Sequence, residues 1–233
     1  MSTPDAAAPL PGIDHEPVEA WIVSHVAGLT PPLRFALISG GHSNITYFVD
    51  DSAGWGAVLR RPPLGSKGGN AHNMAREFQV IAALAGSAVP VPAALALCED
   101  EAVNGSPFYV MGRCAGSVVE NPETVESFFP SLAARRRAGE QIVDVMAAMH
   151  TVDIDAVGLG DAARRDGFLD RQLKRLSGVW EQNKTRELPV METLRERLIS
   201  LKPAQLATGI VHSDYRMGNV MFTADGTLSG VLD

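Results

Sequence analysis

The chain has little of what marks secreted, membrane-bound or nucleic-acid-binding proteins. Two cysteines, Cys98 and Cys114, occur in 233 residues, which excludes a disulfide framework and is typical of reduced, buried thiols. The net charge is −7 with no long basic run, so we expect no nucleic-acid partner. No apolar run approaches the ~20 residues that span a bilayer, and residues 1–13 lack the features of a signal peptide. We expect a cytoplasmic protein with a mobile N-terminal tail and no membrane partner.

The residues that are present predict a mixed fold. A hydrophobic content of 45% supports a substantial core, and the length fits one large domain or two small lobes around a cleft. Apolar residues recur at helical spacing in residues 16–26. Strand patterns follow in residues 35–38, 45–49, 55–60, 93–98 and 107–111, with a helix over residues 72–85 and a turn near residues 99–105. These elements predict a small lobe of about five antiparallel strands with one inserted helix.

The second half of the chain has a different pattern. Residues 112–116 are glycine-rich and are typical of a hinge. Helices are then predicted over residues 123–129, 132–150, 168–182 and 190–201. The whole chain is therefore expected to be an α+β protein, in which a sheet lobe precedes a mostly helical lobe.

A glycine-rich loop joins the first two predicted strands. It contains Gly40, Gly41, His42, Ser43 and Asn44. The glycines remove side-chain bulk and leave backbone N–H groups available for phosphate oxygens, while Ser43 and Asn44 add side-chain donors. The alternative is a merely flexible hairpin, and a single Gly-Gly loop does not exclude it.

Two charged residues in the small lobe form a candidate ion pair. Arg60 ends the third predicted strand and shares a face with Val58, because side chains alternate along a strand. Glu77 adjoins the apolar face of the following helix and could turn inward toward Arg60. The guanidinium fork of Arg60 could then hold phosphate oxygens. Arg61, on the opposite face, is the main competitor, and the alternative for Glu77 is an ordinary surface position.

A polar loop near the end of the chain carries the spacing H-x-D-x-x-x-x-N, from His212 through Asp214 to Asn219. In kinases, the Asp of this spacing orients the attacking hydroxyl and accepts its proton, and the Asn holds Mg²⁺. We expect strands on both sides of the loop. A tight turn at residues 225–226 then returns the chain to Asp233, a second candidate ligand for the metal that bridges the nucleotide phosphates. The alternative is that these residues are ordinary loop polars.

Together these features resemble the aminoglycoside phosphotransferase-like family of small-molecule kinases, and most closely its branch beside or fused to acyl-CoA dehydrogenases. The resemblance covers residues 33–233. It implies a bilobal protein-kinase-like fold, with a leading segment in residues 1–28, a nucleotide-binding lobe in residues 29–112 and an incomplete catalytic lobe in residues 113–233. It also implies that Met111, just before the hinge, contributes to the nucleotide site.

The activity implied by the resemblance is Mg²⁺-dependent transfer of the γ-phosphate of ATP or GTP to a hydroxyl of a small molecule, with a hydroxyacyl thioester favoured over an antibiotic. Two departures matter. Arg60 stands where kinases have a lysine, and the family pattern continues beyond Asp233, so we expect a fragment of a longer enzyme. A nucleotide-binding pseudokinase or inactive fragment is the alternative. A hydrolase using Ser213 and His212 is disfavoured, because no G-x-S-x-G elbow surrounds Ser213.

Overall fold

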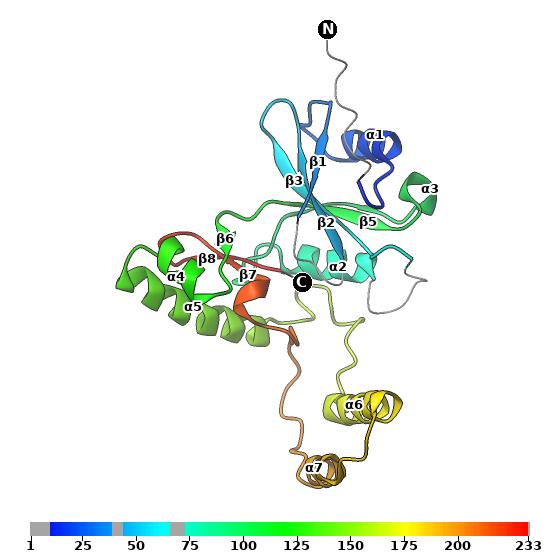
Figure 1. Ribbon diagram of the computed structural model, residues 1–233, viewed down its shortest axis with the longest axis vertical. Helices are drawn as coiled ribbons and strands as arrows, with labels where there is room; N and C mark the ends of the chain where they lie inside the picture. The colour runs from blue at the N-terminus through cyan, green and yellow to red at the C-terminus, as the bar shows by residue number, and fades with distance from the viewer. Residues whose placement is uncertain (1–9, 39–43, 66–72, 233) are drawn as a thin grey trace. The chain divides into compact units, whose positions relative to one another are not determined.

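A computed structural model of the chain describes residues 10–38, 44–65 and 73–232. The chain forms two compact units, Met1–Met149 with His212–Asp233, and His150–Val211. Figure 1 labels most of the elements. The helices are α1 (His15–His25), α2 (Met74–Leu84), α3 (Glu101–Asn104), α4 (Pro122–Phe128), α5 (Leu132–Thr151), α6 (Phe168–Asn183), α7 (Pro189–Ser200) and the 3-10 helix η2 (Met217–Asn219).

The first unit contains a five-stranded antiparallel sheet in the order β1-β2-β3-β5-β4. Its strands are β1 (Arg34–Leu37), β2 (Ile45–Asp50), β3 (Gly56–Arg61), β4 (Ala94–Cys98) and β5 (Phe108–Gly112). Helix α2 lies in sequence between β3 and β4. The predicted lobe of five antiparallel strands with one inserted helix is therefore confirmed.

One face of this sheet is covered by α1. Val18 and Ile22 of α1 have no exposed surface and pack in one cluster with Tyr47, Leu59 and Val110 of the sheet. The apolar stripe of this leading helix is part of the core of the sheet lobe, because the stripe buries a sheet face that would otherwise be open to water.

The other face is covered by α2. Met74 and Phe78 pack against Val58, Tyr109 and Met111. The helix begins at the N-cap Asn73, whose side chain accepts a hydrogen bond from the backbone N–H of Arg76 at 2.9 Å. Since side chains alternate along β3, Val58 and Arg60 share the face under α2, whereas Arg61 belongs to the face under α1.

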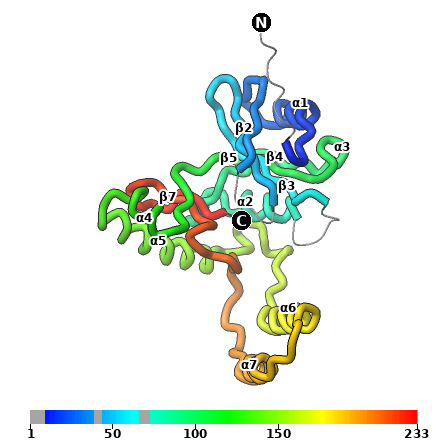
Figure 2. The backbone as a smooth tube through the Cα atoms, in the orientation of Figure 1, coloured from blue at the N-terminus to red at the C-terminus, as the bar shows by residue number. Residues whose placement is uncertain are grey.

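A second, three-stranded sheet holds the end of the chain. It consists of β6 (Ser117–Val118), β7 (Val220–Phe222) and β8 (Leu228–Val231) in that order. β6 pairs antiparallel with β7, so the segment after β5 lies beside a strand about a hundred residues later, as the tube in Figure 2 shows. The backbone N–H of Val231 donates to Pro90 O at 2.8 Å, which ties β8 to the segment before β4.

The turn between β7 and β8 depends on Gly226. Its φ is 88°, in the left-handed region that favours glycine, and a Cβ there would overlap the backbone oxygen of Ala134 in α5. The predicted Asp-Gly turn is therefore present and packs closely against the start of α5.

The second unit, His150–Val211, contains α6 and α7 as a helical pair. The indole Nε1 of Trp180 donates to Glu192 Oε1 at 3.2 Å and joins the two helices. The boundaries of this unit do not coincide with the expected lobe boundary at residue 113, which stays a prediction. Within the described ranges, no helix combines the length and apolar character needed to cross a membrane.

Two local expectations are wrong. Residues near 99–105 form the short helix α3 rather than only a turn, because the Asp100 side chain caps the backbone N–H of Ala102 at 2.9 Å. No strand enters the polar loop: Ile210 and Val211 have no regular structure, and Val211 is 54% exposed. A two-residue apolar run without a partner strand does not form a stable extended element.

Candidate active site

The loop from His212 to Asn219 is fixed by two side-chain hydrogen bonds, one on each side of Ser213. The His212 ring donates from Nε2 to Leu232 O at 2.9 Å, because the carbonyl can only accept. The Tyr215 hydroxyl donates to Ile142 O of α5 at 3.0 Å. Between them, Ser213 has a φ of 72°, a conformation that costs energy for a residue with a side chain. Such strain persists only where the surroundings fix the backbone, and here both neighbouring anchors do so.

Asp214 and Asn219 face each other across this loop. The Asn219 amide nitrogen donates to Asp214 Oδ2 and to Asp214 O, both at 2.9 Å. Asn219 is 7% exposed, whereas the Asp214 side chain is 68% exposed. The buried amide therefore holds an accessible carboxylate. Both hydrogen bonds use the amide nitrogen of Asn219. The amide oxygen Oδ1 therefore remains as an oxygen ligand of the kind that Mg²⁺ prefers.

Arg216 adds a cation to this pair. Its Nε lies 3.4 Å from Asp214 Oδ2, and its Nη1 lies 2.9 Å from Glu120 Oε1, in the segment between β6 and α4. The hydrogen bond to Glu120 is the largest influence on the guanidinium and raises the pKa of Arg216. Neither Arg216 nor Glu120 was assigned a role from the sequence.

The second predicted metal ligand, Asp233, lies outside the described residues. Its neighbour Leu232 donates its backbone N–H to Asn219 O at 2.8 Å and accepts from the His212 ring. In the part of the chain that the structure describes, no three His, Cys, Asp or Glu side chains gather into a metal-binding group. Asn219 is thus the described residue that fits the predicted ligand set.

Arg60 and Glu77 form the predicted ion pair. Arg60 Nε lies 3.1 Å from Glu77 Oε2, and the side chains are 11% and 23% exposed. Glu77 also accepts from Asn44 Nδ2 at 3.1 Å and from the Tyr109 hydroxyl at 3.2 Å. One carboxylate of α2 therefore gathers donors from the start of β2, from β3 and from β5. Sequence reasoning missed Tyr109, whose position opposite Arg60 depends on the β3–β5 register.

Arg61, the competing cation, lies on the other face of the sheet. It is 6% exposed and donates to Pro62 O at 3.1 Å and to Gly12 O. Burial lowers the pKa of its guanidinium. The alternation argument that favoured Arg60 over Arg61 is confirmed.

The remaining predicted nucleotide contacts are only partly described. Gly40, Gly41, His42 and Ser43 lie outside the described residues. Asn44 is 5% exposed and donates to Glu77. Met111 is 8% exposed and packs under α2. Their contact with a nucleotide stays a prediction.

The geometry does not favour a hydrolase. His212 uses Nε2 for Leu232 O, and its Nδ1 is buried without a hydrogen-bond partner. Among the described residues, no hydrogen bond joins the Ser213 hydroxyl to the His212 ring. A serine nucleophile needs a base within hydrogen-bond reach, and His212 does not supply one to Ser213.

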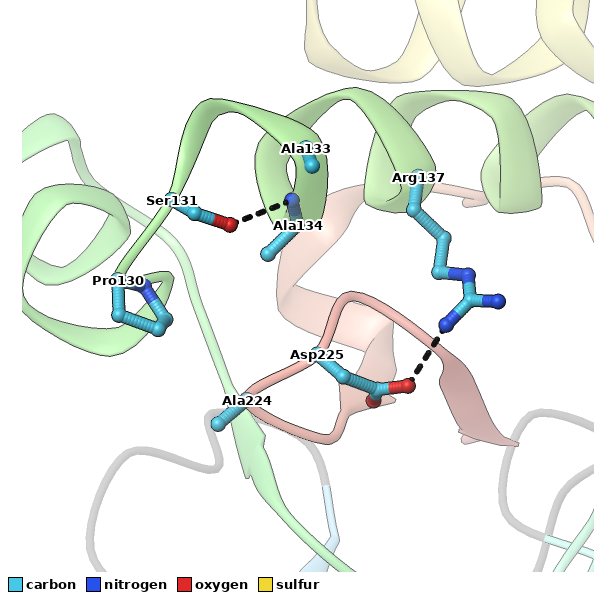
Figure 3. A pocket seen from close by; sticks show the side chains of 7 residues that line it. All are labelled: Pro130, Ser131, Ala133, Ala134, Arg137, Ala224 and Asp225. Carbon is cyan, nitrogen blue, oxygen red and sulfur yellow. Dashed lines mark hydrogen bonds and ion pairs between the residues drawn. The ribbon is translucent and has the colours of Figure 1, made fainter.

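A hollow of about 440 Å³ lies elsewhere, between the start of α5 and the β7–β8 turn. Figure 3 shows Arg137 reaching Asp225 on one side and the Ser131 hydroxyl accepting from the N–H of Ala134 on the other. The ion pair between Arg137 Nη1 and Asp225 Oδ2 measures 2.8 Å. No predicted site residue lines this hollow.

The comparisons with known proteins agree with this geometry. The model of the family described as "Phosphotransferase enzyme family" matches residues 34–233. Acyl-CoA dehydrogenase family member 10 of Mus musculus is 33% identical over 195 residues, which are 83% of this chain and 18% of the mouse protein. The chain spans less than a third of the curated relatives it matches, with shares from 18% to 28%.

Solved structures show the same fold. A crystal structure from Ralstonia eutropha, named for the aminoglycoside phosphotransferases, is 35% identical with a TM-score of 0.79, over 94% of this chain and 64% of that chain. An amicoumacin kinase in complex with AMP-PNP and Ca²⁺ has a TM-score of 0.56 at 14% identity, over 94% of this chain and 63% of that chain. The predicted kinase-like α+β fold is confirmed. Because the family model covers most of the chain, this protein belongs to the phosphotransferase enzyme family.

Proposed function

We propose that this protein transfers the γ-phosphoryl group of ATP or GTP to a hydroxyl group of a small molecule. The observation that carries the proposal is the Asn219–Asp214 hydrogen bond of 2.9 Å in the H-x-D-x-x-x-x-N loop. A buried amide that fixes an exposed carboxylate in a strained, anchored loop is costly to build. Such an arrangement is expected where a group must meet a substrate in a set orientation.

In the proposed reaction, Asp214 accepts the proton of the acceptor hydroxyl while the hydroxyl oxygen bonds to the γ-phosphorus. The bond from the γ-phosphorus to the β–γ bridging oxygen breaks, and the nucleoside diphosphate leaves. Asn219 Nδ2 and Arg216 Nε both contact Oδ2 of Asp214. Oδ1 accepts no hydrogen bond from a described residue, so we assign the proton transfer to it.

The ion pair under α2 serves the nucleotide in this proposal. Glu77 holds Arg60 through Nε, which orients the guanidinium toward phosphate oxygens. Mg²⁺, when bound, would neutralise charge on the phosphate oxygens, and Asn219 together with Asp233 would hold it. Catalysis of this kind is mainly positioning and charge stabilisation, so the preformed contacts of Asp214 and Glu77 matter more than covalent chemistry.

For the acceptor, we propose a hydroxyacyl thioester. The support is that curated relatives over this region carry the name acyl-CoA dehydrogenase family member. A region similar to this chain that is part of a protein named for acyl-CoA oxidation supports a shared substrate class. Because this chain spans only a part of those relatives, their activity is carried over here as a proposal.

Phosphoryl transfer from [γ-³²P]ATP or GTP to hydroxyacyl-CoA tests the function, with an aminoglycoside and unsubstituted acyl-CoA as comparison acceptors. We expect label in the hydroxyacyl product only. Asp214→Asn is expected to lower turnover by about 10²–10⁴-fold while nucleotide affinity stays near wild type, because a general base contributes to chemistry rather than to binding. Nucleotide binding with no transfer to any acceptor would instead favour the pseudokinase alternative.

A further inference from the structure

The exposed guanidinium of Arg216 is held in place by a residue far away in the sequence. Arg216 Nη1 contacts Glu120 Oε1 at 2.9 Å, 96 positions earlier, while Arg216 Nε contacts Asp214 Oδ2 at 3.4 Å. The three side chains are 54% to 68% exposed. Exposed ion pairs stabilise a fold only weakly. A bridge of this kind is therefore better explained by what it orients than by what it stabilises.

The backbone around Glu120 is well fixed, although the side chain is exposed. β6 pairs with β7 through Ser117↔Phe222 and Val118↔Met221. Val119 is 1% exposed. On the other side, Asn121 forms a capping box with Thr124 at the start of α4. Glu120 thus lies between a paired strand and a capped helix. Its backbone is fixed, and its carboxylate contacts Arg216 of the loop.

The loop backbone leaves space for the Glu120–Arg216 ion pair at Gly218. Gly218 lies in η2, immediately before Asn219, and a Cβ there would overlap both Glu120 Oε1 and the Arg216 guanidinium. Its φ is not in the left-handed region. The backbone therefore tolerates alanine at this position, and the space is needed for the ion pair itself.

We propose that Glu120 is a positioning residue for phosphoryl transfer. It holds Arg216, and Arg216, with Asn219, fixes Oδ2 of Asp214 so that Oδ1 faces the acceptor hydroxyl. This inference rests on the proposed function. Arg216 is the contact to the base, whereas Glu120 acts only through Arg216.

The test uses Glu120→Gln, Arg216→Gln, the double variant and Gly218→Ala in the full chain, assayed with the acceptor that wild type phosphorylates. We expect Glu120→Gln and Gly218→Ala each to lower kcat by about 10-fold, since small misplacements of reacting groups have effects of this order or larger. KM for the nucleotide should stay within about twofold of wild type. The double variant should be no slower than Arg216→Gln alone, because Glu120 has no other route to Asp214.

Glu140→Gln is the matched control. It removes an exposed ion pair of similar length, Arg136–Glu140 at 2.8 Å on α5, and should leave kcat unchanged. Melting temperatures of all variants should lie within about 2 °C of wild type, because the side chains that are altered, or that the Gly218→Ala methyl displaces, are exposed. That result separates positioning from a loss of folding.

Three results would overturn the inference. If Glu120→Gln and Gly218→Ala keep wild-type kcat while Asp214→Asn abolishes transfer, the function stands and the positioning role fails. If the Glu120 and Arg216 effects on kcat are additive, Glu120 does not act through Arg216. If wild type transfers phosphate to no acceptor, the proposed function fails, and the inference fails with it.

Discussion

The Glu77 carboxylate is a point in the sheet lobe where a single change should have a large effect. Glu77→Leu keeps the apolar packing of α2 but removes the acceptor that Arg60, Asn44 and Tyr109 share at 3.1, 3.1 and 3.2 Å. The Arg60 side chain, 11% exposed, would then keep its charge in a largely buried place without this carboxylate. Three elements of the sheet would also lose a common connection to α2.

The expected loss of stability follows from these contacts. Breaking a buried ion pair by removing one partner typically costs about 3–5 kcal/mol, but Glu77 is 23% exposed and water can partly replace it. The two further hydrogen bonds to a charged acceptor each contribute about 1.5–3 kcal/mol when fully buried. Their energies are not additive with the ion pair. We therefore expect Glu77→Leu to lower the free energy of unfolding by about 3 kcal/mol, or the melting temperature by about 6–12 °C.

Urea unfolding followed by tryptophan fluorescence measures this change. Trp21 and Trp55 pack against the core of the sheet lobe and report on it. A double-mutant cycle with Arg60→Met measures the interaction energy between the two side chains more directly. Because the double variant leaves neither charge behind, it should be destabilised by less than the sum of the two single changes. Glu140→Leu, which removes an exposed pair, should cost less than about 1 kcal/mol.

Two outcomes would refute the reasoning. If Glu77→Leu lowers the unfolding free energy by no more than the Glu140→Leu control does, the carboxylate is not the centre of a buried network. If the Arg60 and Glu77 effects simply add, the two side chains do not interact in solution.

Two further predictions concern the last third of the chain. Asn219→Ala should abolish most of the Mg²⁺-dependent gain in nucleotide affinity, because it removes an oxygen ligand; equal gains in variant and wild type, measured by calorimetry with and without Mg²⁺, would remove Asn219 from the metal site. The Thr223 and Thr227 hydrogen bonds lower the pKa of Asp225 to about 2. Its contribution to stability should be complete above the unfolded pKa of about 3.9 and decline as the pH falls toward 2. The stability gap between wild type and Asp225→Asn should therefore narrow as the pH falls from about 4 to about 2 in urea titrations, and a gap independent of pH would contradict the assignment.

Much of the sheet lobe could be predicted from local sequence. The strands are short, mostly apolar runs bounded by turn residues, and the apolar residues of 74–84 recur at helical spacing, so element types and order follow from the local pattern. The strand period of two placed Arg60 on the face of Val58 and Arg61 on the other face. The structure confirms both placements, with Arg60 under α2 and Arg61 buried near Gly12.

The candidate catalytic loop could be predicted because one short segment carries its motif. His212, Asp214 and Asn219 are recognised by spacing, and the Asp-Gly turn that follows fixes the return of the chain. The prediction of a strand that enters this loop was wrong. Ile210 and Val211 have the right composition, but a strand also needs a partner, and pairing is decided by segments far along the chain.

The residues that contact the candidate site from other segments could not be predicted either, because those contacts also depend on segments far along the chain. Tyr109 reaches Glu77 from 32 positions away, and Glu120 reaches Arg216 from 96 positions away. Tyr109 depends on the register of β5 against β3. Glu120 depends on a two-residue strand, β6, too short to leave any period in the sequence. The proposed reacting groups therefore share a local motif, whereas the groups proposed to orient them lie on segments that are distant in sequence and close in the fold. A search for such positioning residues in relatives should begin from the strand that pairs with β7, not from the candidate catalytic loop itself.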